Sequence, residues 1–317
     1  MEPIIPPISR AVLESELTRD RFVRFSSRGE NKLFDVTAQE APNVMREIGR
    51  LREIAFRAAG GGTGLSCDID EFDTDVECPY HQLVVWDPRA KEILGGYRYL
   101  LGAGIKPEKL ATSPIFSFSE LFLSKYLPMT IELGRSFVQP NYQNTNDNRT
   151  GMYALDNLWD GLGALIVRFP AMKYFFGKVT MYRSYNQQAR NCLLYFMSKY
   201  FPDPDKLVLP TTPLDELNLD NPYYERLFNT GEYEKDYKIL SQEIKAYGER
   251  IPPLINSYMR ISPNMRVFGT TLNNHFGGVE ETGILISIDD MYPEKVGRHM
   301  NTLKNLANLV GLRWWKR

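Results

Sequence analysis

Few cysteines, almost no net charge and no long apolar run characterise this chain of 317 residues. The three cysteines, Cys67, Cys78 and Cys192, have no CxxC spacing, which argues against a disulfide framework or a zinc site and fits a reducing compartment. The net charge of -1 argues against a broad nucleic-acid-binding surface. No stretch approaches the about 20 consecutive apolar residues of a membrane-spanning helix. Residues 1–7 lack the basic and apolar regions of a signal peptide, so we expect a cytoplasmic protein.

The composition is that of a globular protein, with 43% hydrophobic and 24% charged residues. Its length suffices for one large domain or two small ones. We expect an N-terminal arm at residues 1–40, a core at 41–200 and a linker at 201–230. Residues 231–317 should pack on that core as an extension of helices and strands.

The spacing of apolar residues along the chain predicts the main helices and strands. Apolar residues on one face predict a helix at 42–59, and Thr37 and Glu40 before it have the spacing of a capping box. Two β-prone runs, 80–87 and 93–101, predict an antiparallel hairpin. Further elements are expected as strands at 129–139, 174–182, 266–268 and 283–288, and as helices at 154–166, 186–200, 232–247, 251–259 and 293–310.

The strand expected at 129–139 carries charge inside an apolar run. Glu132 and Arg135 lie among residues such as Ile131 and Leu133. A charged residue rarely lies in a core strand unless it is paired or used. Two interpretations stay open: a structural ion pair between strands, or an acid–base or substrate-holding pair at the mouth of a sheet. Arg98, in the second strand of the hairpin, is flanked by aromatic residues.

Two polar segments resemble ligand loops without matching them. The acidic run at 68–75 has the composition of a calcium loop, but it lacks the central glycine and the glutamate at the twelfth position. We therefore expect no bound metal there. The glycine-rich run at 60–64 lacks the GK[ST] ending of a phosphate loop and follows a helix instead of opening one, so it predicts a flap.

An ordered set of short motifs carries a family resemblance. The motifs are Asp70-Glu-Phe-Asp73, His81-Gln-Leu-Val-Val with Asp87, Gly96-Tyr-Arg98-Tyr, Ser117-Phe-Ser-Glu120-Leu with Leu123, Glu132-Leu-Gly-Arg-Ser136 and Leu158-Trp-Asp-Gly161-Leu. Together they resemble the acyl-CoA N-acyltransferase (GNAT) fold, over about residues 45–290. Within it they are similar to the hemolysin-like long-chain N-acyltransferases of ornithine-lipid and glycine-lipid synthesis, relatives of the acyl-homoserine-lactone synthases. The sequence departs from the family at 144–151, where an insertion replaces a shorter basic turn.

The resemblance implies both fold and activity. The fold would be α/β (α+β): a mixed, mostly antiparallel, twisted sheet flanked by helices, with a C-terminal extension. The enzyme would transfer a 3-hydroxy fatty acyl group to the amine of an amino acid, glycine or ornithine, in aminolipid biosynthesis. The run at 141–162 resembles Bacteroides-type versions, which favours glycine. The donor substrate and partner would be acyl carrier protein, or acyl-CoA in its place, with no covalently bound cofactor and no metal.

The chemistry of amide formation assigns roles to the charged strand. An amine must lose a proton before it attacks a thioester, so Glu132 is the candidate base, acting directly or through water. Backbone N–H groups at Phe137 and Val138 are candidate donors to the thioester oxygen. Arg98 or Arg135 can bind the acceptor's carboxylate.

Other site residues follow from the resemblance or from the need for an apolar tunnel. The resemblance places Arg135 beside Glu132 as catalytic, and Asp70, Asp73 and Ser136 on the substrate. Trp159 is expected on the acyl donor. The candidate tunnel residues are Phe116, Phe118, Leu158, Trp159, Leu162 and Phe175, and for each aromatic residue among them plain core packing is the commoner explanation. A basic patch for acyl carrier protein is expected at Arg183 and Arg190, or at Lys173 and Lys178.

Two alternative functions and one membrane question stay open. The same fold serves acetyl-CoA-dependent N-acetyltransferases, and a hemolysin-like protein can also be a non-catalytic interaction protein. An amphiphilic product suggests peripheral contact with the inner membrane. The run at 309–317 has paired tryptophans, Trp314 and Trp315, among basic residues. That composition fits an interfacial anchor, and it fits packing of a closing helix equally well.

Overall fold

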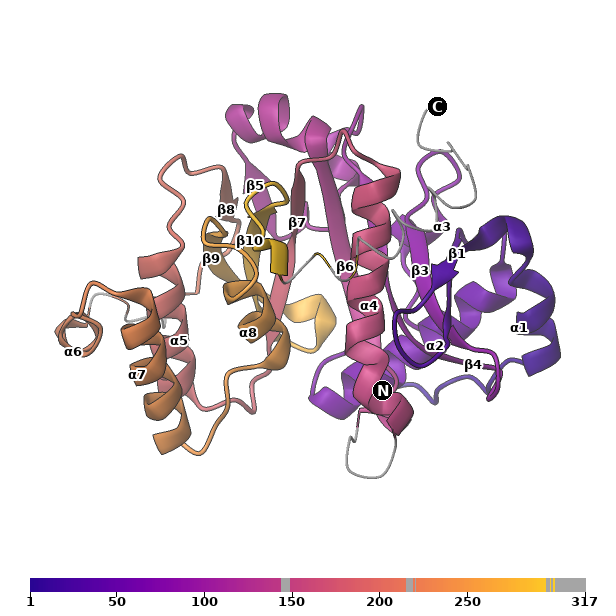
Figure 1. Cartoon of the computed structure of the whole chain (residues 1–317), viewed down its shortest axis with the longest axis horizontal. Coiled ribbons are helices and arrows are strands. Elements are labelled where there is room, and N and C mark those ends of the chain that lie inside the picture. Colours follow the sequence, from indigo (N-terminus) through magenta and orange to yellow (C-terminus); the bar gives the residue numbers. More distant parts are fainter. Residues whose placement is uncertain (144–148, 215–218, 220, 295–296, 298, 300–317) are drawn as a thin grey trace.

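The structure is a computed structural model that describes residues 1–143, 149–214, 219, 221–294, 297 and 299, and of residues 149–152 the backbone alone. Figure 1 shows helices packed on both faces of a large central sheet. The strands of this sheet are β1 (Phe22–Phe25), β2 (Lys32–Val36), β3 (His81–Asp87), β4 (Glu92–Leu101), β6 (Thr130–Val138), β7 (Tyr174–Met181), β9 (Arg266–Asn273) and β10 (Val279–Ser287). A small second sheet pairs β5 (Phe116–Phe118) with β8 (Val208–Pro210).

The large sheet has the order β1-β2-β3-β4-β6-β7-β10-β9. Every neighbouring pair is antiparallel except β6 and β7, which are parallel. These two strands pair only over three residues, Thr130 to Glu132 opposite Tyr174 to Phe176. Beyond Glu132 they are no longer paired, so the sheet opens between them. This confirms the mixed, mostly antiparallel GNAT-like sheet expected from the sequence.

Helices cover both faces of the sheet. In chain order they are α1 (Arg10–Glu16), α2 (Pro42–Ala59), α3 (Glu71–Thr74), α4 (Arg149–Arg168), α5 (Gln187–Tyr200), α6 (Pro222–Leu227), α7 (Tyr233–Ala246) and α8 (Pro253–Met259). Helix α4 crosses the front of the sheet in Figure 1, and α1 and α2 lie to its right. The two faces have separate apolar clusters, one around α2 and another around α4 and α5. None of the described helices is long and apolar enough to cross a bilayer.

Single turns complete the chain between these elements. They lie at Arg19–Arg21, Pro107–Lys109, Phe122–Tyr126, Leu127–Met129, Pro140–Tyr142 and Asn274–Phe276. The last of them joins β9 to β10.

Local sequence explains several of these boundaries. Helix α2 occupies the predicted residues 42–59, and Gly60, with φ at 96°, ends it in the left-handed conformation that glycine tolerates. Helix α5 begins after Asn186, whose side chain accepts hydrogen bonds from the N–H groups of Gln188 and Ala189. In α4, Gly161 permits close approach to the sheet, because a Cβ there would lie 1.9 Å from Leu83 Cδ2. The hairpin β3–β4 is also confirmed.

Other expectations need correction. Glu40 accepts hydrogen bonds from the N–H and hydroxyl of Thr37, but α2 begins only at Pro42, so this pair closes a turn and caps no helix. Strands β9 and β10 are longer than predicted, because pairing with each other and with β7 overrides their polar residues. Strands β1 and β2 lie within residues 1–40, the segment expected as an arm, and β9 and β10 lie within residues 231–317, expected as an extension of helices and strands on the core. The helix expected at 293–310 and the tryptophans Trp314 and Trp315 lie outside the described residues.

Candidate active site

The site is built around a bulge in β6. The register between β4 and β6 shifts between Gly96 and Arg98. Arg135 and Ser136 of β6 together lie opposite Tyr97 of β4. Arg135 has a positive φ of 51°, which is rare for a residue with a side chain. A bulge re-aims side chains at the edge of a ladder, and this one directs Arg135 to the face that also carries Arg98.

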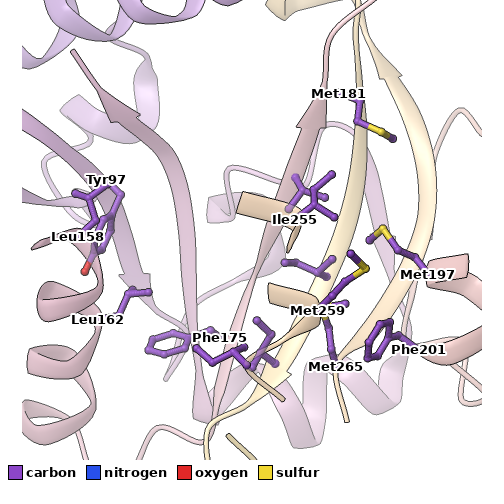
Figure 2. Packing of buried hydrophobic residues seen from close by; sticks show 14 of the residues in the cluster. Tyr97, Leu158, Leu162, Phe175, Met181, Met197, Phe201, Ile255, Met259 and Met265 are labelled. Atoms are coloured by element: carbon purple, nitrogen blue, oxygen red, sulfur yellow. The ribbon is translucent and has the colours of Figure 1, made fainter. Parts of the chain in front are cut away.

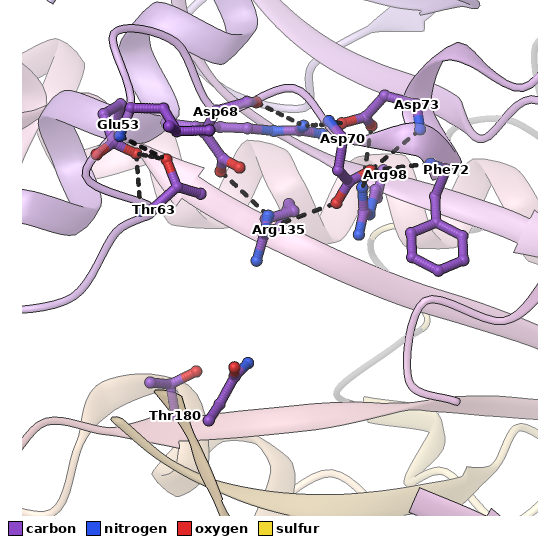
Figure 3. Close-up of polar contacts among 12 residues, drawn as sticks. Glu53, Thr63, Asp68, Asp70, Phe72, Asp73, Arg98, Arg135 and Thr180 are labelled. Carbon is purple, nitrogen blue, oxygen red and sulfur yellow. Dashed lines mark hydrogen bonds and ion pairs between the residues drawn. The ribbon is translucent and has the colours of Figure 1, made fainter. Parts of the chain in front are cut away.

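Three arginines and three aspartates form a buried arginine–aspartate cluster on that face, made of Arg52, Asp68, Asp70, Asp73, Arg98 and Arg135. Nη1 of Arg98 lies 2.6 Å from Asp70 Oδ1 and 3.2 Å from Asp73 Oδ1. Nε of Arg135 lies 3.1 Å from Asp68 Oδ2, and its Nη2 lies 3.6 Å from Asp70 Oδ2. Figure 3 shows Arg135 between these carboxylates and the neighbouring strand that carries Thr180.

Helix α3 holds two of the aspartates in place. Asp70 is its N-cap and Asp73 its third residue, and each side chain accepts a hydrogen bond from the other's backbone in a capping box. Burial acts to raise the pKa of Asp73, yet the guanidinium groups of Arg52 and Arg98 hold it well below its ordinary value. The predicted calcium-like loop is therefore a set of carboxylates bound to arginines.

Glu132 lies on the same face but is enclosed separately. Its carboxylate accepts hydrogen bonds from the Tyr80 hydroxyl, from the Ala111 N–H at 3.2 Å, and from the N–H and hydroxyl of Thr112 at 3.0 and 2.6 Å. Burial raises the pKa of Glu132, and the bonds from Thr112 and Tyr80 offset this in part. The Tyr80 ring links Glu132 to the cluster, because Arg98 Cζ lies 5.1 Å from its centre.

A cavity of about 280 Å³ occupies the opening between β6 and β7. One end is apolar and lies under α4 and α8. Its walls include Leu155, Leu158, Trp159, Leu162, Phe175, Tyr258, Ile284 and Ile286. Figure 2 shows Leu158 and Leu162 beside Tyr97, with Phe175 farther along on β7. The other end is polar and reaches the arginine–aspartate cluster through Arg135 and Ser136.

An ion pair that sequence reasoning missed completes the polar end. Lys178 of β7 donates to Glu281 of β10, and both line the cavity. Glu281 also accepts from Asn273 Nδ2 at 2.9 Å and from the Thr180 hydroxyl at 3.3 Å. Burial lowers the pKa of Lys178, and the carboxylate of Glu281 offsets part of this effect.

Two residues of the expected basic patch are not available at the surface. The Lys178 side chain is 15% exposed and pairs with Glu281, and the Arg190 side chain is 4% exposed and pairs with Glu280. Each is largely shielded from solvent because its strand or helix position faces a neighbouring element that supplies a carboxylate. Arg183 is exposed, and the Lys173 side chain is 42% exposed.

The predicted site residues divide into two groups. Among the described residues, Arg135, Ser136 and Trp159 line the cavity. The others lie beside it, in the cluster, in the ladder or in the enclosed Glu132 site: Asp70, Asp73, Arg98, Glu132, Phe137 and Val138. Of the candidate tunnel residues, Leu158, Trp159, Leu162 and Phe175 line the cavity, whereas Phe116 and Phe118 pack in a separate cluster around Phe176.

Comparison with known proteins agrees with the fold. A family model for the acetyltransferase (GNAT) domain matches residues 51–150. With its opened mixed sheet and the cavity in the opening, the protein is an N-acyltransferase of the GNAT fold.

Two relatives narrow this class. A glycine N(alpha)-acyltransferase of Phocaeicola vulgatus is 54% identical over 95% of this chain and 94% of its own length. A glycine N(alpha)-acyltransferase of Bacteroides thetaiotaomicron is 56% identical over 95% of this chain and 90% of its own length. The chain belongs to the glycine N(alpha)-acyltransferase family.

Proposed function

We propose that this enzyme transfers a 3-hydroxy fatty acyl group from acyl carrier protein to the amine of glycine. Both relatives are named for glycine as the acceptor. The 3-hydroxy group and the carrier protein follow from the resemblance to the aminolipid N-acyltransferases. Transfer forms the amide C–N bond and breaks the thioester C–S bond, and the donor leaves as a free thiol.

The observation that supports this proposal best is the cavity with two unlike ends. Its volume of about 280 Å³ is close to the ~300–1,000 Å³ of pockets that enclose drug-sized ligands. An acetyl group would leave most of the apolar end empty, whereas an acyl chain would bury itself against Trp159, Leu162 and Phe175. This favours a long-chain donor over the acetyl-CoA alternative.

The alternation of the β4–β6 ladder favours Val138 over Phe137 as the donor to the thioester oxygen. Gln139 N–H donates to Leu94 O at 2.9 Å, so Gln139 faces β4. Neighbouring residues of a strand direct their backbone groups to opposite sides. The Val138 N–H is therefore directed away from β4 and toward the opening, whereas Phe137, paired with Gly96, faces β4.

Glu132 is the proposed final acceptor of the amine proton. Its carboxylate is enclosed by Tyr80 and Thr112, so the proton would reach it through the Tyr80 hydroxyl or through water. Burial raises its pKa, which brings a carboxylate closer to the operating pH and makes it a better base.

Purified enzyme tests this proposal with acyl carrier protein loaded with 3-hydroxy acyl chains, the matching acyl-CoA series, and a panel of amino acids. Mass spectrometry of the lipid products identifies acceptor and chain. We expect N-acylglycine from the long-chain carrier-protein donor. Acylation of ornithine in place of glycine, or turnover of acetyl-CoA alone, would refute it.

A further inference from the structure

The Lys178–Glu281 pair lies where an acceptor must approach. Both side chains line the polar end of the cavity, next to Arg135 and Ser136, which continue toward the candidate thioester position at Val138. They come from different strands, since Lys178 lies on β7 and Glu281 on β10. The register of these strands places Lys178 opposite Gly283 and Glu281 opposite Thr180, so both project to the face that carries Arg135.

The pairing of β7 with β10 does not depend on the Lys178–Glu281 ion pair. Strands β7 and β10 are joined by an unbroken ladder from Glu280 opposite Met181 to Ser287 opposite Tyr174. One more link adds little to such a ladder, whereas the removal of two charges from water costs several kcal/mol. Buried ion pairs of this kind are weak contributors to stability. A charged pair at the wall of a cavity is therefore better explained by a ligand than by strand pairing.

Glu281 is fixed by more contacts than Lys178. Glu281 is fixed by Asn273 and Thr180 as well as by Lys178. The Lys178 ammonium lies at the end of a flexible side chain, and its ion-pair partner among the described residues is Glu281. The Lys178 ammonium can therefore turn toward an incoming anion while the carboxylate stays in place.

The arginines of the site are already engaged. Arg98 pairs with Asp70 and Asp73, and Arg135 pairs with Asp68 and Asp70. An acceptor carboxylate at either guanidinium would compete with two aspartates, one of them fully buried. The Lys178 ammonium faces one carboxylate, and a free amino acid offers it a second without leaving Glu281 unpaired.

We propose that Lys178 and Glu281 bind the acceptor as a free amino-acid zwitterion, an inference that rests on the proposed glycine N-acyltransferase function. Lys178 binds the carboxylate of the amino acid and Glu281 binds its ammonium group. One internal ion pair is thus replaced by two, and neither charge is left unpaired in the cavity. The acceptor amine is then held at the opening between β6 and β7, facing the acyl end of the cavity.

Steady-state kinetics with two acceptors test this assignment. Wild type, Lys178→Met and Glu281→Gln are compared with glycine and with glycinamide, which keeps the amine but lacks the carboxylate. Loss of a charge-assisted contact should raise the KM for glycine about 10- to 100-fold in Lys178→Met and leave the KM for glycinamide nearly unchanged. Glu281→Gln should raise the KM for both acceptors.

Matched controls separate this site from general damage. Glu280→Gln changes the preceding residue of β10, which pairs with Arg190, and Lys235→Met changes an exposed lysine of α7. Both should leave the two KM values unchanged. If Lys178→Met or Glu281→Gln fails to fold, Lys178→Arg and Glu281→Asp keep the charge and displace it, and they should still raise the KM for glycine.

Each result decides the proposal. An equal rise in KM for glycine and glycinamide in Lys178→Met would overturn the zwitterion site. Unchanged KM values in both folded variants would overturn it too. In either case, transfer to glycine by the wild-type enzyme would still support the proposed function. A wild-type enzyme that acylates no amino acid would overturn the proposed function and this site with it.

Discussion

The guanidinium carbon of Arg135 lies 4.3 Å from the centre of the Phe276 ring. This contact joins the bulge of β6 to the turn between β9 and β10, two segments far apart in the chain. Phe276 also packs edge-on against Phe56 of α2, at a centroid distance of 5.1 Å. Arg135 is thus clamped between an aromatic ring and two aspartates, which fixes it at the polar end of the cavity.

The positive φ of Arg135 predicts unequal effects of two truncations. Both Arg135→Gly and Arg135→Ala remove the guanidinium and should abolish most acyl transfer. Because only glycine tolerates this conformation without strain, Arg135→Gly should be more stable than Arg135→Ala by about 1 kcal/mol. Urea unfolding of the two variants measures the difference. Equal stabilities would show that the backbone at this bulge relaxes.

The arginine–aspartate cluster predicts an acid-dependent loss of stability. The pKa of Asp73 in the folded protein lies below its ordinary value of 3.8, so its stabilisation is present above that pH and is lost as the pH falls through the folded pKa. Asp73→Asn leaves Arg52 and Arg98 short of a buried partner and should cost about 3–5 kcal/mol at neutral pH.

Unfolding of wild type and Asp73→Asn over a pH series measures this dependence. The difference in unfolding free energy should shrink progressively below pH 3.8. A pH-independent difference would contradict a stabilising role for the ionised carboxylate.

Tyr80 predicts the direction of a shift in the pH–rate profile. The hydrogen bond from the Tyr80 hydroxyl lowers the pKa of Glu132. Tyr80→Phe should therefore move the acidic limb of the pH profile of kcat/KM to higher pH. Glu132→Gln should lower kcat by about 10²–10⁴-fold. Tyr99→Phe is the matched control, because the Tyr99 hydroxyl bonds Asp35 at 2.7 Å instead. An unshifted limb in Tyr80→Phe would exclude Glu132 as the titrating base.

The apolar end of the cavity predicts control of chain length. Leu162→Trp fills space beside Trp159 and should lower kcat/KM for long acyl donors relative to short ones by about 10-fold or more. Ile166→Trp, on the same helix and outside this wall, is the control. A competition assay with mixed chain lengths gives the ratio directly. An unchanged preference would place the acyl chain elsewhere.

Local patterns were enough to predict much of this fold. The ends of α2, the hairpin β3–β4 and the cap of α5 depend on residues within a few positions of one another. The order of the strands in the sheet could not be predicted from local patterns, because β10 pairs with β7 across about a hundred residues of chain. No local pattern states which distant strand will be the partner.

The candidate site was predicted in the same uneven manner. Glu132 was conspicuous because charge interrupts an apolar strand, and the same argument applies to Lys178 between Gly177 and Val179. The sequence-based expectation for Lys178 is only a place in a surface basic patch. Glu281 gave a weaker signal, since its neighbours Glu280 and Gly283 are poor strand formers and the strand forms through its ladders with β7 and β9.

The place of β10 inside the sheet has a consequence for synthesis on the ribosome. Strands β1 to β7 are complete by Met181, yet β7 gains its second neighbour only when Val279–Ser287 has emerged. Until then β7 is an edge strand with unpaired backbone groups, and Lys178 lacks its ion-pair partner Glu281. A nascent chain that stalls within residues 201–230 would therefore expose the unpaired edge of β7. That edge could pair with a strand of another chain until β10 is synthesised.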